Sequence, residues 1–266
     1  MKIIDAHCHL NKKEWISNTS EPDNDFLIAN YGFDYTEGFI SNNMKEANIE
    51  STIIFPIPSI YVDLRKANRY VLETALANSN FGKFIPFSII DKSPQYWYER
   101  GARGFKQHDY GQNIHPKDLV NYKESYQFMQ EKELPLLVHS GIPIQKRIEE
   151  IINYAPNLKI ILAHCGAEFL KKNDYKPHIG QVHNILQSLK GHKNLYFDIS
   201  ALEDKEIIKM AIEEVGDDKV IFGSDFPEEK PVSALARLKS LQLEDSRLEN
   251  ILHNNICRIL NNRFLS

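Results

Sequence analysis

The chain has 266 residues, of which 42% are hydrophobic and 26% are charged, and its formal net charge at pH 7 is −4. No apolar run approaches the roughly 18 residues that a membrane span needs. The mildly acidic balance, with no basic block, argues against a nucleic acid or an anionic membrane as the partner. No linker or composition shift divides the chain, so we expect one domain over residues 1–266.

The start of the chain and its cysteines indicate a reducing compartment. Met1 and Lys2 lead directly into an apolar run without a signal-peptide pattern. The three cysteines, Cys8, Cys165 and Cys257, are odd in number and far apart, which argues against a disulfide framework. We therefore expect a cytoplasmic protein.

Eight short apolar segments bounded by turn residues are typical of buried parallel strands. They cover residues 2–7, 51–57, 83–90, 102–107, 134–140, 158–165, 194–200 and 219–225. Helical periodicity occurs between most of them, at residues 36–49, 67–79, 121–133, 144–155 and 204–216. This alternation predicts an α/β fold, a single (β/α)8 TIM barrel, with extra helices after Pro231 and over residues 243–262.

A long segment, residues 11–38, separates the first predicted strand from its helix. Loops of this length are more often functional lids than accidents. Aromatic residues give the segment apolar anchors: Trp15, Phe26, Tyr31, Phe33 and Tyr35. We predict a lid over a substrate, with an ordinary packed insertion as the alternative. The same aromatic side chains are candidates for the interface of a homo-oligomer.

Polar residues gather at the carboxyl ends of the predicted strands, where the active site of such a barrel lies. They are His7, His9, Lys106, His108, His139, His164 and Asp225. His7 and His9 are two residues apart in a strand and can aim both imidazoles at one point. Imidazoles and a carboxylate are typical ligands of Zn²⁺ and similar ions. The pattern predicts a divalent metal site, with hydrogen-bonded core polar residues as the bland alternative.

Five motifs occur in a fixed order along the chain: IIDAHCHL, RGFKQH, LLVHSG, IILAHCG and FGSDFP. Together with the tail ENILHNNICRIL, they resemble the amidohydrolase superfamily, and more closely its amidohydrolase-related branch of metal-dependent hydrolases and decarboxylases. The resemblance covers nearly the whole chain.

The resemblance implies a role for each matching residue. It implies that His7, His9, His139 and Asp225 bind the ion, for which Zn²⁺ is the first expectation and Mn²⁺ or another divalent ion the alternative. His164 would contact substrate or transfer a proton, although in binuclear relatives this histidine binds a second metal. Asp225 would also accept a proton from the attacking water, which makes His164 and Asp225 the expected catalytic residues.

Three residues are predicted to contact substrate: Lys106, His108 and Trp15. Two roles of Lys106 stay open, a cationic contact to substrate and a carboxylated lysine that bridges two metals, as in binuclear relatives. For His108 the alternative is bonding within its own loop.

Other polar and thiol residues near the strand ends carry weaker signals. Asp5, expected on the same strand face as His7, supports the ligands or is structural. Cys8 and Cys165 alternate away from the neighbouring histidines and are expected in the core. Arg103 and Asp198 are expected to contribute polar packing, and the sequence assigns neither a further role.

The implied function is a metal-dependent hydrolase of a small-molecule amide, ester or lactone. A non-oxidative decarboxylase of a small carboxylic acid would use the same residues and is the alternative. A TatD-type deoxyribonuclease ranks lower, because its relatives carry a glutamate-centred fourth strand where this chain has RGFKQH. A purely structural metal is disfavoured, because such zinc sites are usually closed and cysteine-rich.

Overall fold

The computed structural model describes residues 1–12, 14, 34–59, 62–77, 83–139, 143–167 and 179–262. One eight-stranded sheet runs in the order β1 to β8, and successive strands pair in parallel. The strands are β1 (Ile4–Leu10), β2 (Ser51–Pro56), β3 (Lys83–Ile89), β4 (Gly104–His108), β5 (Leu136–His139), β6 (Ile160–Leu162), β7 (Leu195–Asp198) and β8 (Val220–Ile221). The predicted TIM barrel is confirmed.

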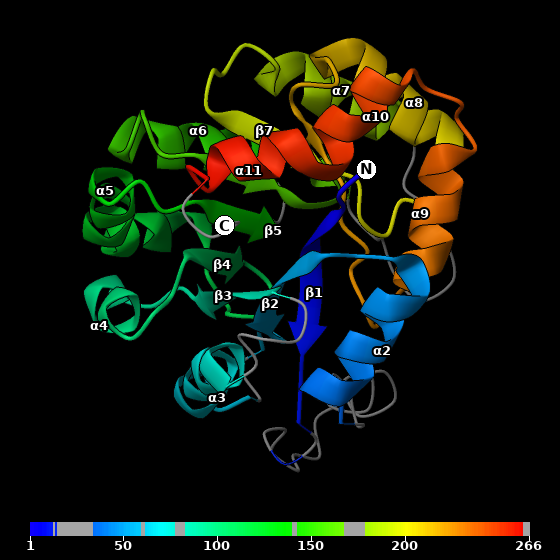
Figure 1. Cartoon of the computed structure of the whole chain (residues 1–266). Helices are drawn as coiled ribbons and strands as arrows, with labels where there is room; N and C mark the ends of the chain where they lie inside the picture. Colours follow the sequence, from blue (N-terminus) through cyan, green and yellow to red (C-terminus); the bar gives the residue numbers. More distant parts are fainter. Residues whose placement is uncertain are drawn as a thin grey trace, which may run out of the picture.

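Helices surround the strands (Figure 1). They are α2 (Glu37–Ala47), α3 (Leu64–Ala77), α4 (Pro94–Glu99), α5 (Lys123–Glu131), α6 (Ile144–Tyr154), α7 (Ile179–Leu189), α8 (Lys205–Val215), α9 (Pro231–Lys239), α10 (Asp245–Glu249) and α11 (Asn255–Ile259), with short helical turns η2 (Pro116–Tyr122), η3 (Ala163–Gly166) and η4 (Asn250–Asn254). The expected helices after Pro231 are present as α9 to α11. In the described part of the chain, no helix has the length and apolarity that a membrane crossing requires.

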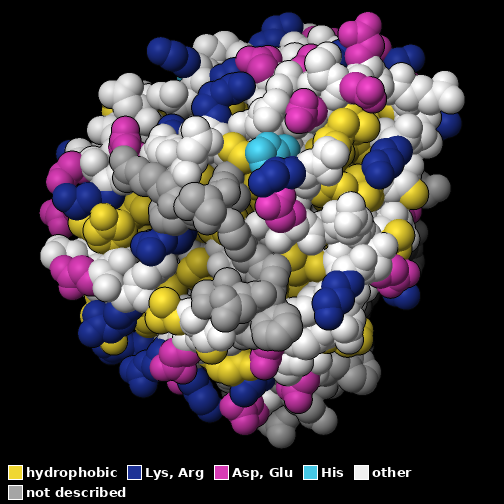
Figure 2. All heavy atoms as spheres, in the orientation of Figure 1, with side chains coloured by type: hydrophobic (Ala, Val, Ile, Leu, Met, Phe, Trp, Pro, Cys, Tyr) yellow, Lys and Arg dark blue, Asp and Glu magenta, His cyan; other side chains and the backbone are white. Residues whose placement is uncertain are grey.

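Local sequence signals explain where some of these helices begin and end. The Asp204 carboxylate accepts the N–H of Glu206 (2.9 Å), which satisfies a free donor at the start of α8. Asn48 follows the end of α2 with φ 54°, the left-handed conformation that asparagine tolerates. Basic and acidic side chains are interspersed on the face shown in Figure 2, in line with the small net charge.

The barrel closes between β1 and the segment that follows β8. The N–H of His9 donates to the carbonyl of Phe226 (2.7 Å), and the N–H of Asp225 donates to the carbonyl of His7 (2.8 Å). The first and last strands therefore meet at a seam. This seam brings together residues that lie more than 200 positions apart in the sequence.

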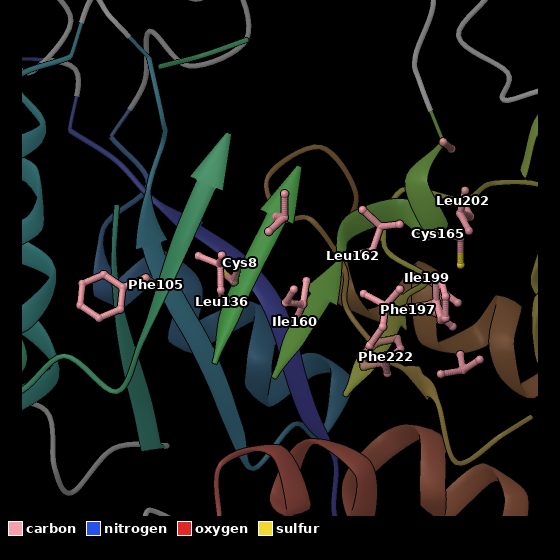
Figure 3. Close-up of a cluster of buried hydrophobic side chains, with 14 of the residues drawn as sticks. Cys8, Phe105, Leu136, Ile160, Leu162, Cys165, Phe197, Ile199, Leu202 and Phe222 are labelled. Atoms are coloured by element: carbon pink, nitrogen blue, oxygen red, sulfur yellow. The ribbon is translucent and has the colours of Figure 1, made fainter. Parts of the chain in front are cut away.

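Apolar side chains pack in two layers, one inside the barrel and one between the strands and the helices. The interior cluster contains Ile4, Ala6, Ile53, Phe55, Ile85, Phe87, Leu137, Ile161, Tyr196 and Ile221, with Ile256, Ile259 and Leu260 from the C-terminal helices. The outer cluster contains Cys8 and Cys165 beside residues such as Phe105, Leu136 and Phe222 (Figure 3). Both cysteines are buried and free, as predicted.

Two strands differ from the prediction near functional residues. Between Asp5 and Cys8, two residues of β1 stand opposite one of β2, which is a β-bulge. The bulge breaks the alternation from which a shared face of Asp5 and His7 was inferred, so that inference no longer follows. β6 ends at Leu162, and His164 lies beyond it with φ 54°, in the left-handed region.

α11 lies at the N-terminal end of the barrel and is tied there by Lys159, just before β6. The Lys159 ammonium donates to the carbonyls of Arg258 and Ile259 (both 3.0 Å) and to the Asn261 side chain. Carbonyls at a helix end have no partner within the helix, so a cation there stabilises them.

We expect Lys159→Met to lower the free energy of unfolding by about 1–3 kcal/mol, because it removes hydrogen bonds from a charged donor. Urea denaturation followed by circular dichroism measures this. Lys146→Met, an exposed lysine on α6, is the control and should change stability little. Equal midpoints for the two variants would contradict the role of Lys159.

Candidate metal centre

Three of the predicted metal ligands meet at the seam between β1 and β8. Asp225 Oδ1 lies 3.0 Å from His7 Nε2 and 3.1 Å from His9 Nε2. All three side chains are buried. One carboxylate oxygen is thus shared by two imidazole nitrogens, and these residues form a group with the spacing of metal ligands.

Asp5 fixes the backbone around this group. Its Oδ1 accepts the N–H of His7 (3.1 Å) and the N–H of Ser224 (2.9 Å), and its Oδ2 accepts the hydroxyl of Ser224 (2.5 Å). Burial raises the pKa of Asp5 to about 6, although the hydrogen bonds from Ser224 and His7 lower it. Asp5 therefore ties β1 to the loop after β8, which carries Asp225.

The hydrogen-bond directions at His7 indicate that the seam is built around a cation. His7 Nδ1 lies 2.8 Å from Asp198 Oδ2, and a carboxylate accepts, so Nδ1 carries the hydrogen. In a neutral imidazole, Nε2 is then an acceptor, yet it faces the acceptor Oδ1 of Asp225 at 3.0 Å. Two acceptors this close need a proton or a metal ion between them. Ligand atoms around a tetrahedral Zn²⁺ are about 3.3 Å apart, so the donor set fits such an ion.

Protonation of His7 is the alternative to a bound cation. Burial and Lys106 lower the pKa of His7, but the carboxylates of Asp225 and Asp198 outweigh them, and the pKa is raised. Asp225 itself is ionised: burial raises its pKa, but His7, His164 and hydrogen bonds from His7 and His9 hold it well below its usual value. The seam therefore attracts a proton when no metal is bound.

The remaining histidines of the interior are neutral imidazoles, the form that binds metals. Burial lowers the pKa of His9 to about 4, against the opposing effect of Asp225. Burial also lowers the pKa of His164, and it holds those of His108 and His139 well below the usual value. The site thus offers imidazole lone pairs at physiological pH.

His164 lies beside the seam. Its Nε2 is 3.9 Å from Asp225 Oδ2, and its ring centroid is 5.1 Å from that of His7. Its Nδ1 lies 2.9 Å from the backbone carbonyl of Ser200, which can only accept. His164 Nδ1 therefore carries the hydrogen, and Nε2 carries the lone pair.

Lys106 points into the same interior and is fully buried. Its Nζ lies 3.3 Å from His7 Nε2 and 5.1 Å from the centroid of the Phe55 ring. Burial lowers the pKa of Lys106 to about 8, although Asp225 and Asp198 raise it. An amine with this pKa carries its charge at neutral pH and loses it in mild alkali.

His139 and His108 pack together at the ends of β5 and β4. Their ring centroids are 4.1 Å apart, and the His139 ring lies 4.8 Å from that of His164. Among the described residues, His139 is in neither of the two groups with metal-ligand spacing. The structure therefore brings His7, His9 and Asp225 together more tightly than it brings His139 to them.

The loop after β4 holds His108 by its Nδ1, which accepts the N–H of Gly111 (2.9 Å). A Cβ on Gly111 would lie 1.8 Å from the carbonyl oxygen of Pro58, so only glycine fits this approach. His108 therefore makes a hydrogen bond within its own loop, which was the alternative to a contact with substrate. This bond uses Nδ1 and does not involve Nε2. Trp15 lies outside the described residues, as do residues 15–33 of the predicted lid.

The sequence analysis missed two residues of the site. They are Asp198, at the end of β7, and Ser200, two residues further along the chain. Asp198 contacts His7, and Ser200 contacts both His7 and His164. The signal was present, since NLYFDIS ends a predicted strand in polar residues as the other site strands do.

The family model described as Amidohydrolase matches residues 4–261. The chain belongs to the amidohydrolase family. This membership makes it an enzyme, either a hydrolase or a decarboxylase, and together with the His and Asp group at the seam it supports a divalent metal site. No curated protein sequence matches the chain.

Solved structures with the same fold include amidohydrolase-type proteins of both activities. An amidohydrolase from Burkholderia multivorans with bound zinc is 14% identical, with a TM-score of 0.75 and coverage of 98% of this chain and 99% of that chain. A proposed 2-pyrone-4,6-dicarboxylic acid hydrolase from Pseudomonas putida is 14% identical (TM-score 0.73, 98% of both chains). A dihydroxybenzoic acid decarboxylase from Polaromonas sp. JS666 with bound manganese is 17% identical (TM-score 0.70, 98% of both chains). At these identities the likeness shows the fold.

Proposed function

We propose that this amidohydrolase is a zinc-dependent hydrolase of a small-molecule amide, ester or lactone. The observation that carries the proposal is the single Asp225 oxygen shared by the Nε2 atoms of His7 and His9. His139 completes the proposed ligand set, and its ring borders the same interior. Mn²⁺ or another divalent ion is the alternative to Zn²⁺.

The residues around the ion would transfer protons during the reaction. A bound divalent ion lowers the pKa of a water and polarises a carbonyl group. Asp225 Oδ2 and His164 Nε2 are 3.9 Å apart, so the two groups can take a proton from water and return it to the leaving group. In this proposal Asp225 and His164 are catalytic.

Three residues are proposed to bind the substrate. Lys106 offers a buried ammonium to an anionic group, and His108 offers its Nε2, because Nδ1 is engaged by Gly111. Trp15 is proposed as an apolar cover from the segment after β1.

Metal content and activity on one preparation test the proposal. Protein purified without chelator should contain one divalent ion per chain by plasma mass spectrometry, with an unmodified intact mass. Chelation should abolish hydrolysis of a panel of lactones, esters and amides, and Zn²⁺ should restore it. No metal after reconstitution with zinc or manganese would contradict the proposal. Two ions per chain would replace the mononuclear form by one in which His164 binds the second ion and carboxylated Lys106 or another group bridges the two ions.

A decarboxylase is the second candidate, and Lys106 is the observation that favours it. A buried ammonium 3.3 Å from His7 Nε2 suits a substrate carboxylate beside the ion. His164 would then protonate the carbon that loses CO₂. Incubation of the zinc and manganese forms with aromatic and heterocyclic carboxylic acids, with CO₂ trapping, separates the candidates, because a hydrolase releases none.

The pKa of Lys106 predicts a pH limit for anionic substrates. The ammonium is present below about pH 8 and is lost above it, and a bound cation moves this limit lower. We therefore expect KM of the metal-bound enzyme for an anionic substrate to rise with increasing pH, with a midpoint below 8. In Lys106→Met this rise should vanish, and KM should be high at every pH. A neutral ester is the control substrate. An unchanged pH profile in Lys106→Met would exclude the role of this lysine.

A further inference from the structure

Residues at the end of β7 hold the Nδ1 atoms of two histidines in the site. Asp198 Oδ2 lies 2.8 Å from His7 Nδ1, and the Ser200 carbonyl lies 2.9 Å from His164 Nδ1. The Ser200 hydroxyl is 3.1 Å from His7 Nδ1 and 2.9 Å from His164 Nδ1. All four residues are buried. One short segment thus contacts imidazoles that come from β1 and from the turn after β6.

The second group with metal-ligand spacing, His7, His164 and Asp198, is a hydrogen-bonded network. Asp198 Oδ1 accepts the N–H of Ser200 (2.8 Å), the N–H of His164 (3.4 Å) and the hydroxyl of Ser200. Burial raises the pKa of Asp198, but His7, His164 and Ser200 lower it below its usual value, so it is a carboxylate that only accepts. Because its oxygens are already engaged by donors, this group supports the neighbouring site and does not form one of its own.

We propose that Asp198 is a positioning residue that keeps the hydrogen of His7 on Nδ1 and thereby presents the Nε2 lone pair to the metal ion. The carbonyl oxygen of Ser200 likewise keeps the hydrogen of His164 on Nδ1, which leaves the lone pair on Nε2 for proton transfer. The inference rests on the proposed metal-dependent function. It adds Asp198, the last residue of β7, and Ser200 just beyond that strand, which carries neither the proposed metal ligands nor the proposed acid and base.

The three donors on Asp198 Oδ1 make the substitution Asp198→Asn a sharp test. They require an acceptor at that position, so the amide oxygen of the new side chain will occupy it. The amide NH₂ must then face His7 Nδ1, where the carboxylate oxygen was. A donor there moves the hydrogen of His7 to Nε2, the atom that has to bind the metal.

Zinc affinity by competition with a chromogenic chelator is the first readout. We expect Asp198→Asn to bind Zn²⁺ about 10- to 100-fold more weakly than the wild type, as for other groups that orient a ligand. The control is Asp217→Asn, which alters a partly buried carboxylate that contacts Arg247 and Asn250 and not the metal site. Thermal midpoints of both variants show that they fold. Wild-type zinc affinity in Asp198→Asn would overturn the proposal.

The ¹⁵N shifts of His7 in metal-free protein are the second readout, taken at a pH where the same spectra show His7 to be neutral. The wild type should carry the hydrogen on Nδ1 and Asp198→Asn on Nε2, a difference that a loss of packing would not produce. Hydrogen on Nε2 in the wild type would refute the inference even if Asp198→Asn fails to fold. If the wild type binds no metal, the proposed function fails, and the spectra still decide the tautomer.

Discussion

Replacing Asp225 by Asn should weaken metal binding by at least about a hundredfold, since even groups that only orient a ligand are worth 10- to 100-fold. Asp225 supplies the only carboxylate oxygen in the described group with His7 and His9. Asparagine keeps the size of the side chain and tolerates the φ of 62° at this position, so a loss of binding reports the lost charge. We expect enzymatic activity to fall with the metal content, as measured on the same samples.

The matched control for this substitution is Asp245→Asn, an exposed carboxylate at the start of α10. It should retain metal and activity. His7→Ala should lose both, as Asp225→Asn does, but it also leaves Asp198 without its partner and is the less clean variant. Full metal content and activity in both Asp225→Asn and His7→Ala would rule out the metal site at the seam.

The largest loss of stability is expected from Arg147→Met. Arg147 on α6 is buried, and its Nη1 donates to Asp109 Oδ2 (2.9 Å) and to the carbonyl of Ile114 (3.0 Å). Its removal leaves the buried charge of Asp109 without a counterion, which costs about 3–5 kcal/mol. For a chain of this size that corresponds to a fall in Tm of about 10 °C, measured by calorimetry.

Two further variants separate this effect from a general loss of charge. Lys132→Met removes an exposed ion pair with Glu131 and should change stability little. Adding Asp109→Asn to Arg147→Met removes the stranded charge and should restore part of the stability. If Arg147→Met has the same Tm as Lys132→Met, the buried Arg147–Asp109 pair contributes nothing measurable to stability.

The Arg147–Asp109 ion pair belongs to a hydrogen-bonded network that connects α5 and α6 to β4 and its site residues. Gln107 donates to Asp109 Oδ1 (2.7 Å) and accepts the hydroxyl of Tyr126 (2.8 Å). The N–H of Asp109 donates to the carbonyl of His139 (3.1 Å). Gln107 lies between Lys106 and His108 in the chain, so the network fixes the strand that carries both.

The barrel could be predicted because each strand is a short apolar run and most of the segments between strands show the helical periodicity of apolar residues. The positions of the proposed metal ligands follow from one rule, that polar residues after parallel strands meet at one edge. That rule applies equally to Asp198, to which the sequence analysis assigns no role, because a sequence does not show whether a strand-end carboxylate faces the barrel or its surroundings.

The finer geometry depended on features that alternation alone does not contain. The bulge in β1 changes which residues share a face with His7, and the left-handed turn at His164 lies beyond the end of β6. His108 is held by Gly111, whose close approach to Pro58 is a long-range contact. Such contacts arise from packing between distant segments, and local propensity does not specify them.

The seam between β1 and the segment after β8 makes metal binding a measure of whether the barrel has closed. His7 and His9 lie on β1, whereas Asp225 and the side chains of α11 that fill the base of the barrel lie more than 200 positions further along the chain. The proposed ligands therefore come together only when the first strand has paired with the segment that follows the last one.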